Sequence, residues 1–211
     1  QLVPAGEMAS NLSHVPTRHW NADLDPNRYI VEQTEELHAR LLFHGADTAQ
    51  HTVQSNQHSW ATLDAVAVID WLGQQQAQVP VPGEVVRTVA DRDGRWNQLE
   101  VRQQQQGEFT PIVWSSQPAN NMLYLIEMAN VQTVGAHLDD LALDAAASVR
   151  VVLQVTDTST PDVVLLGFPQ APTDVLRRGV STSAWTHDAQ SGTVILHETA
   201  GAGWSDWTVV P

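Results

Sequence analysis

His58 is the residue of this sequence whose type and position best fit a chemical role. It lies in a polar segment, and residues 61–73 that follow it have the apolar spacing of a helix. An imidazole titrates near neutral pH and can accept the proton of a serine hydroxyl. For this it needs a carboxylate that fixes its tautomer and stabilises the imidazolium. Asp25 is the upstream candidate, at an interval that fits one helix and one strand.

Strand and helix signals alternate in the first third of the chain and would position these two residues. Apolar side chains recur at helical spacing, and a glycine ends each helical stretch. Short connections between strand, helix and strand favour a parallel sheet unit, whose strands open at the same edge. Asp25 and His58 are therefore expected to meet at this edge. The predicted elements are strands at residues 14–20 and 49–55 and helices at residues 29–45 and 61–73.

The second part of the chain has a different character. Residues 76–83 are predicted to be a linker, because the stretch around them holds two prolines and follows a run of glutamines. Residues 84–211 contain short runs rich in β-branched and aromatic residues, separated by turn signals. This pattern is typical of a β-sandwich or barrel. The last residues carry two tryptophans, which are expected to pack on another element.

Two short motifs give residues 1–75 a resemblance to a known family. The stretch HWNADLDPNRYIVEQ resembles the His-Gly-x-x-Asp-Pro segment of α/β-hydrolases, and NQHSW resembles their Gly-His-x-x-Trp segment. The resemblance covers about residues 10–73. It implies the C-terminal part of a serine esterase or a prolyl-oligopeptidase-like enzyme, with Asp25 as the acid and His58 as the base. The expected fold class is α/β plus all-β: the last strands and helices of a hydrolase sheet, followed by a β-sandwich-like domain.

The sequence departs from this family in its nucleophile. No Gly-x-Ser-x-Gly motif occurs in the chain, and the earlier strands of the fold have no counterpart. The resemblance therefore implies a partner, an N-terminal hydrolase portion carrying the serine, which is expected to be a second chain from the same precursor. Ester and peptide substrates are both open. No cofactor and no metal are expected.

Composition limits the other classes of function. The formal net charge of −14 disfavours binding to nucleic acid, and no apolar run is long enough to span a bilayer. The chain has no cysteine, which excludes disulfides and thiolate chemistry. Together with the resemblance, this favours an extracellular or cell-surface location.

Alternative interpretations accompany each candidate. Asp23 is the second choice for the acid, and Asp25 itself is of a type common in turns and helix caps. A metal site could be drawn from His14, His19, Asp23 and Asp25, since imidazole and carboxylate are good ligands, but their spacing is not distinctive.

The β-rich part offers alternatives of its own. Residues 91–94, DRDG, begin like a calcium loop but lack its closing glutamate, so a hairpin turn is the simpler prediction. Five tryptophans could form a face for carbohydrate or could pack in the core. If the first part is not catalytic, the protein is a binding or structural surface module that uses the β domain. The five tryptophans are Trp96, Trp114, Trp185, Trp204 and Trp207.

Overall fold

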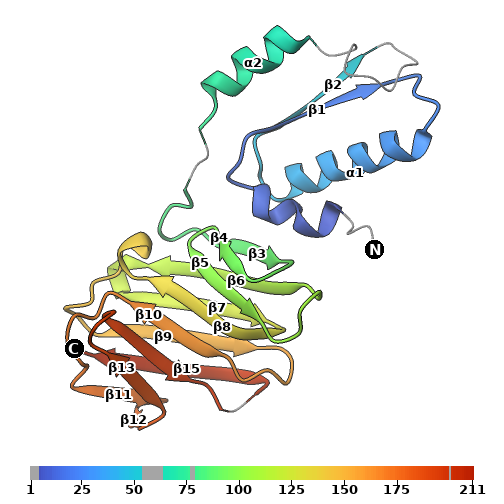
Figure 1. Cartoon of the computed structure of the whole chain (residues 1–211). Coiled ribbons are helices and arrows are strands. Elements are labelled where there is room, and N and C mark those ends of the chain that lie inside the picture. Colours follow the sequence, from blue (N-terminus) through green and yellow to red (C-terminus); the bar gives the residue numbers. More distant parts are fainter. Residues whose placement is uncertain (1–4, 54–63, 77–78, 200) are drawn as a thin grey trace. The chain divides into compact units, whose positions relative to one another are not determined.

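The computed structural model describes residues 5–53, 64–76, 79–199 and 201–211. The chain divides into two compact units, Gln1–Val79 and Pro80–Pro211 (Figure 1). Within the described residues, the first unit contains a 3-10 helix, two strands and two α-helices. The second is built of strands with two short 3-10 helices.

A parallel strand pair forms the centre of the first unit. β1 and β2 pair from Thr17 opposite Thr48 to Ala22 opposite Val53, and α1 connects them. The predicted parallel strand–helix–strand arrangement is confirmed. The elements of this unit are η1 (Ala5–Leu12), β1 (Thr17–Ala22), α1 (Arg28–Phe43), β2 (Thr48–Val53) and α2 (Ala65–Gln74).

Helix α1 ends at Phe43, two residues before the end that the sequence predicts. Gly45 adopts a left-handed conformation with φ 77°, which glycine reaches without strain. The N–H groups of Gly45 and Ala46 then donate to the carbonyl oxygens of Leu42 and Leu41, at 3.0 Å in both cases. Leu41 is fully buried and, with Ala46 and Ala9 of η1, forms the small core of this unit.

Helix α2 is capped by Asp64, whose Oδ1 accepts hydrogen bonds from the N–H groups of Val66 and Ala67, both at 3.1 Å. Residues 61–63, where the sequence predicts the helix to begin, lie outside the described residues. The expected stop at Gly73 is wrong by one residue, since the helix continues to Gln74. In the parts of the chain that the structure describes, neither α-helix has the length and hydropathy needed to cross a membrane.

Two mixed sheets make up the second unit. One contains six strands in the order β13-β14-β10-β8-β5-β4, and the other seven in the order β12-β11-β15-β9-β7-β6-β3. Most neighbours are antiparallel, but β7 with β9 and β8 with β10 are parallel. The strands are β3 (Val86–Ala90), β4 (Gly94–Trp96), β5 (Leu99–Gln103), β6 (Thr110–Gln117), β7 (Met122–Met128), β8 (Val131–His137), β9 (Val149–Val155), β10 (Asp162–Leu166), β11 (Asp174–Arg177), β12 (Val180–Ser181), β13 (Trp185–Asp188), β14 (Thr193–His197) and β15 (Gly203–Val210). The 3-10 helices are η3 (Pro118–Asn120) and η4 (Asp139–Leu141).

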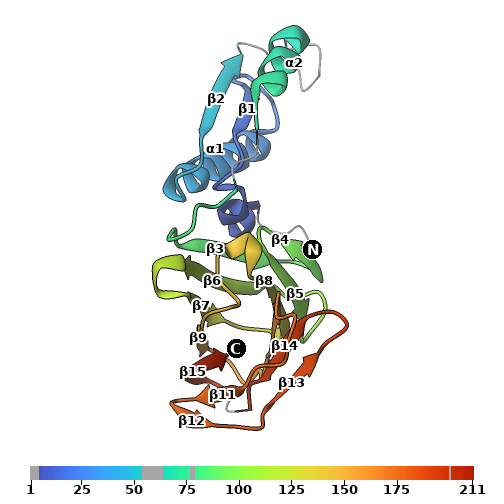
Figure 2. The same cartoon turned by 90° about the vertical axis from the view of Figure 1, so that its left-hand side faces the viewer.

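The two sheets pack face to face as a sandwich (Figure 2). Side chains alternate along each strand, so that every second residue enters the space between the sheets. On β9, for example, Val149, Val151, Leu153 and Val155 are buried, and the residues between them are exposed or partly exposed. One continuous apolar core results, and the all-β prediction for this part of the chain agrees with it.

The predicted fold class of the whole chain is wrong. Strands dominate the described residues, which contain two α-helices, and both large sheets mix parallel and antiparallel pairs. This mostly-β architecture does not fit the C-terminal portion of an α/β-hydrolase sheet followed by a separate β domain. Helical periodicity indicates single helices but not the size of the sheet they pack on, and here β1 and β2 form a sheet of two strands.

Residues 91–94 have a different role from the hairpin that the sequence predicts. β3 belongs to the seven-stranded sheet, whereas β4 belongs to the six-stranded one. The loop therefore carries the chain from one sheet to the other. Asp93 stabilises this crossing, because its Oδ1 accepts hydrogen bonds from the N–H of Gln103 at 2.8 Å and from Nε2 of Gln106 at 2.9 Å. These hydrogen bonds lower the pKa of Asp93.

Asp157 stabilises the chain just after β9. The N–H of Asn130 donates to its Oδ2 at 2.6 Å, and the N–H of Ser159 donates to its Oδ1 at 2.9 Å. Burial raises the pKa of Asp157, but the hydrogen bonds from Ser159 and Asn130 outweigh this and hold the pKa below its usual value of 3.8. The ionised carboxylate is thus favoured by folding.

Replacing Asp157 with asparagine should weaken the dependence of stability on acid pH. The folded-state pKa lies below the unfolded one, so the carboxylate contributes fully above the unfolded value and loses its contribution as the pH falls through the folded value. The measurement is urea unfolding of the full chain at several pH values between about pH 5 and pH 3. The variant should lose less stability over this range than the wild type, with Asp70→Asn on exposed α2 as control. Equal losses in Asp157→Asn and wild type would contradict this role.

Candidate functional site

Asp25 lies in the turn that follows β1. Its N–H donates to the carbonyl oxygen of Ala22 at 3.2 Å, and its own Oδ1 accepts a hydrogen bond from the N–H of Asn27 at 2.8 Å. The residue is only 5% exposed although it carries a carboxylate. The turn leads directly into α1. A buried acid therefore stands at the carboxyl end of a parallel strand, which is where such sheets place their sites.

His58, the predicted base, lies outside the described residues. The end of the strand that precedes it is described, and it lies beside the turn of Asp25. Val53, the last residue of β2, accepts a hydrogen bond on its carbonyl oxygen from the N–H of Asp23 at 3.0 Å. The chain thus enters residues 54–63 from the same edge of the sheet that holds Asp25.

Asp23, the alternative acid, belongs to the same turn but is less buried than Asp25. Its backbone is engaged at both ends, because its N–H donates to Val53 and its carbonyl oxygen accepts from Nη1 of Arg28 at 3.4 Å. Burial is what makes a carboxylate an effective partner for a charged imidazole, since the attraction is stronger in a low-dielectric site. Of the two, Asp25 has the more suitable environment.

The described histidines of this unit do not form a metal site. His19 and His38 lie with ring centroids 5.8 Å apart, and burial, together with the nearby His38, lowers the pKa of His19. His38 has its Nδ1 within 3.2 Å of the hydroxyl of Thr48. Across the described ranges, no three histidine, aspartate or glutamate side chains come together in a way that could hold a metal ion. The grouping of His14, His19, Asp23 and Asp25 drawn from the sequence is therefore not formed.

Apolar side chains on α2 remain uncovered. Val66, Ile69 and Leu72 follow one another at three-residue intervals and are 69%, 66% and 57% exposed. None of the residues of α2 is buried. An amphipathic helix normally gains its stability by burying such a stripe. Further apolar side chains of the unit are exposed as well, namely Leu24, Tyr29, Ile30, Leu42 and Phe43.

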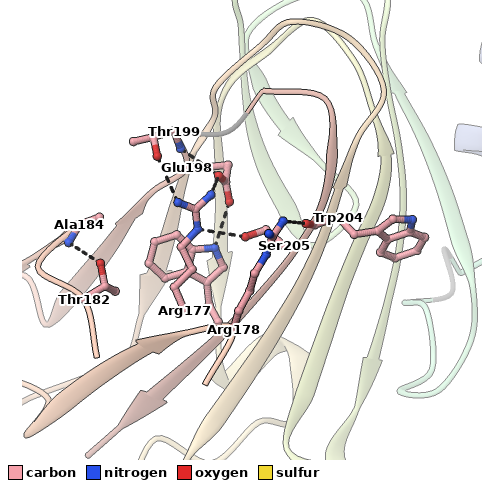
Figure 3. A network of polar contacts seen from close by, with 9 residues as sticks. Arg177, Arg178, Thr182, Ala184, Glu198, Thr199, Trp204 and Ser205 are labelled. Atoms are coloured by element: carbon pink, nitrogen blue, oxygen red, sulfur yellow. Dashed lines mark hydrogen bonds and ion pairs between the residues drawn. The ribbon is translucent and has the colours of Figure 1, made fainter. Parts of the chain in front are cut away.

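The second unit contains a buried polar network that the sequence analysis did not identify (Figure 3). Glu198 follows β14 and is 3% exposed. Its Oε1 forms an ion pair with Nη2 of Arg177 on β11, and its Oε2 accepts a hydrogen bond from Nε1 of Trp207 on β15 at 3.2 Å. The guanidinium of Arg177 also lies 5.2 Å from the ring centre of Trp207.

The remaining hydrogen-bonding groups of this network are paired as well. Arg177 donates through Nη1 to Oγ1 of Thr199 at 3.1 Å and through Nε to Oγ of Ser205 at 3.3 Å. The N–H of Thr199 donates to Oε1 of Glu198 at 2.9 Å. Because β14 belongs to one sheet and β11 and β15 to the other, the network joins the two layers. Because the polar groups of the network form hydrogen bonds and an ion pair within the protein, a structural role is indicated.

Four of the five tryptophans of the second unit pack in or against its core and do not form an exposed binding face. Trp114 and Trp207 are fully buried in the core, and Trp96 and Trp185 pack against it. Their indole nitrogens donate to protein acceptors, such as Oγ1 of Thr88 for Trp114 at 3.2 Å. The predicted five-tryptophan face is therefore not formed, and the core interpretation holds for these four. Trp204 differs, because it is 54% exposed.

No protein-family model matches this chain, and the search of curated proteins found no match.

Proposed function

We propose that the first unit supplies the acid and the base of a serine hydrolase, Asp25 and His58. The observation that carries this proposal is the burial of the Asp25 carboxylate at the carboxyl end of β1, next to the end of β2 from which the chain runs to His58. The nucleophilic serine comes from a partner, which we expect to be an N-terminal hydrolase portion cut from the same precursor.

In this mechanism His58 takes the proton of the serine hydroxyl while the oxygen attacks the carbonyl carbon of an ester or peptide. Asp25 accepts a hydrogen bond from the other ring nitrogen and stabilises the imidazolium that forms. The proton then passes to the leaving group, and an acyl-enzyme remains. Water, activated by His58 in the same way, releases the acid. The oxyanion donors belong to the partner together with the serine.

The uncovered surfaces of the first unit support a partner. Parallel strands are normally buried on both faces, and two strands alone seldom form a stable sheet. β1 and β2 pair only with each other within the described residues, so each has an open edge that a further strand could extend. Val66, Ile69 and Leu72 offer apolar surface to the same partner.

The test is to isolate the native particle from the extracellular fraction or the cell surface and to treat it with a fluorophosphonate probe. We expect a second polypeptide to copurify and to carry the label on a serine. Particles with His58→Ala should label much more slowly, because the serine then has no base.

A folded chain that is isolated alone and does not label would overturn the proposal. The alternative, a non-catalytic binding or structural module that uses the β-sandwich, would then be the better account.

A further inference from the structure

Trp204 presents its indole ring on the outer side of the seven-stranded sheet. It lies on β15, where Ser205, Trp207 and Val209 point inward and are buried, so that Trp204 faces outward by alternation. Its ring points away from the network of Arg177 and Glu198 (Figure 3). The other tryptophans of this unit bury their rings against the core. An exposed tryptophan lacks this burial and offers a flat apolar surface to a ligand.

An open hollow adjoins this ring. It has a volume of about 370 Å³, at the lower end of the range of about 300–1,000 Å³ that is usual for small-molecule sites. It is open to solvent and large enough for one sugar ring. Its lining consists of Val152, Arg178, Trp204, Ser205 and Asp206.

Polar groups beside the ring are held in place. Nε of Arg150 on β9 donates to Oδ1 and Oδ2 of Asp206 at 2.9 and 3.1 Å, and Nη2 of the same residue completes a two-pronged ion pair. The N–H of Arg178 donates to the carbonyl oxygen of Asp206 at 2.7 Å, and its Nη2 donates to the carbonyl oxygen of Trp204 at 2.6 Å. Binding would therefore require little ordering of these side chains.

The chemistry of the hollow combines an aromatic platform with adjacent donors and acceptors. A carboxylate offers about four acceptor positions and a guanidinium five donors, so both Asp206 and Arg178 can form further hydrogen bonds. The charge of Asp206 is balanced by Arg150, so the guanidinium of Arg178, which donates to a backbone carbonyl oxygen, adds a positive charge to the hollow. Vicinal hydroxyl groups, which donate and accept at once, match this arrangement.

We propose that the hollow is a binding subsite for a gluco-configured saccharide. One pyranose ring stacks its C–H face on Trp204, and two neighbouring hydroxyls bind Asp206 and Arg178. The gluco configuration fits because its equatorial hydroxyls leave both ring faces apolar. This subsite belongs to the β-sandwich and does not depend on the hydrolase proposal.

Calorimetric titration of the full chain with cellohexaose tests the subsite. We expect saturable binding by the wild type and a loss of affinity of at least about fivefold in Trp204→Ala, comparable to the removal of a stacking platform for a nucleic-acid base. Asp206→Asn should also weaken binding, because it removes an acceptor. Trp185→Phe is the matched control, since Trp185 packs against the core and should leave binding unchanged.

Circular dichroism of each variant shows whether it is folded; Trp204 is exposed, so its replacement should be tolerated. Absence of cellohexaose binding by the folded wild type would overturn the proposal. So would a Trp204→Ala variant that binds as tightly as the wild type.

Discussion

Replacing Glu198 with alanine should lower the free energy of unfolding by about 3–5 kcal/mol, a large fraction of the stability of an ordinary domain. The carboxylate is buried and compensates the guanidinium of Arg177, whose side chain is only 21% exposed. Without Glu198 this cation stays near the core with no counter-charge. The indole N–H of Trp207 and the backbone N–H of Thr199 lose their acceptor at the same time.

Urea unfolding of the full chain measures this effect, and a surface pair provides the control. Arg87 and Glu127 form an ion pair at 2.8 Å, but both side chains are about half exposed. Glu127→Gln should therefore change the stability by less than about 1 kcal/mol. A Glu198→Ala variant that loses no more than this control would show that the network does not join the sheets.

The double variant Arg177→Met, Glu198→Gln separates the cost of an unpaired charge from the loss of the network. If the uncompensated cation causes most of the damage, removing it should restore part of the stability lost in Glu198→Gln alone. An additive loss would instead assign the effect to packing and to the other hydrogen bonds.

The sequence predicted the regular elements best where apolar spacing was strong. α1 and the parallel pair of β1 and β2 lie close to their predicted positions, and several strands of the sandwich coincide with β-branched runs. Local patterns of this kind reflect burial on one face and need no knowledge of distant contacts.

Strands with weak patterns are harder to predict from the sequence. β8 contains Gly135, which looks like a break in a strand. In the sheet, Gly135 pairs with Glu100 of β5, and a Cβ at this position would lie 3.2 Å from the Cβ of Glu100. Glycine is thus favoured by close packing between neighbouring strands. Likewise, β15 follows a glycine-rich segment, and the sequence predicts only that its two tryptophans pack on another element. In the structure β15 is an interior strand between β11 and β9.

The network of Glu198 could not be predicted for a related reason. Its members come from β11, β15 and the segment after β14, and only the arrangement of both sheets brings them together. From the sequence alone, a charged residue between strand-like runs is predicted to be exposed to solvent. In the sequence, Arg177 and Glu198 each stand at the end of a β-rich run. Many charged residues occupy such positions, so this feature does not identify the two as partners.

For the first unit, the sequence predicted a strand followed by a turn at Asp25, because an aspartate directly before proline is a local turn signal. That Asp25 is buried, and Asp23 less so, depends on the tertiary packing of the turn, which the local sequence does not encode. Because the two aspartates differ in burial, replacing each of them separately can show which one acts as the acid.

If the first unit acts in a serine hydrolase as proposed, replacing Asp25 with asparagine should reduce kcat of the particle by about 10⁴-fold, while leaving the fold intact. Asparagine keeps an oxygen that can accept the hydrogen bond from the N–H of Asn27, so the turn should survive. It cannot stabilise an imidazolium, and its amide would favour the wrong tautomer of His58. The measurement is hydrolysis of a p-nitrophenyl ester by the particle that contains both polypeptides, with its thermal unfolding recorded in parallel.

Asp23→Asn is the matched control, since Asp23 stands in the same turn two residues earlier. It should leave kcat within a few-fold of the wild type. If Asp23→Asn instead causes the large loss and Asp25→Asn does not, the acid is Asp23. If neither variant changes kcat although the particle hydrolyses the ester, the catalytic carboxylate is not in this turn, and the buried Asp25 serves to hold the chain between β1 and α1 through its hydrogen bond to Asn27.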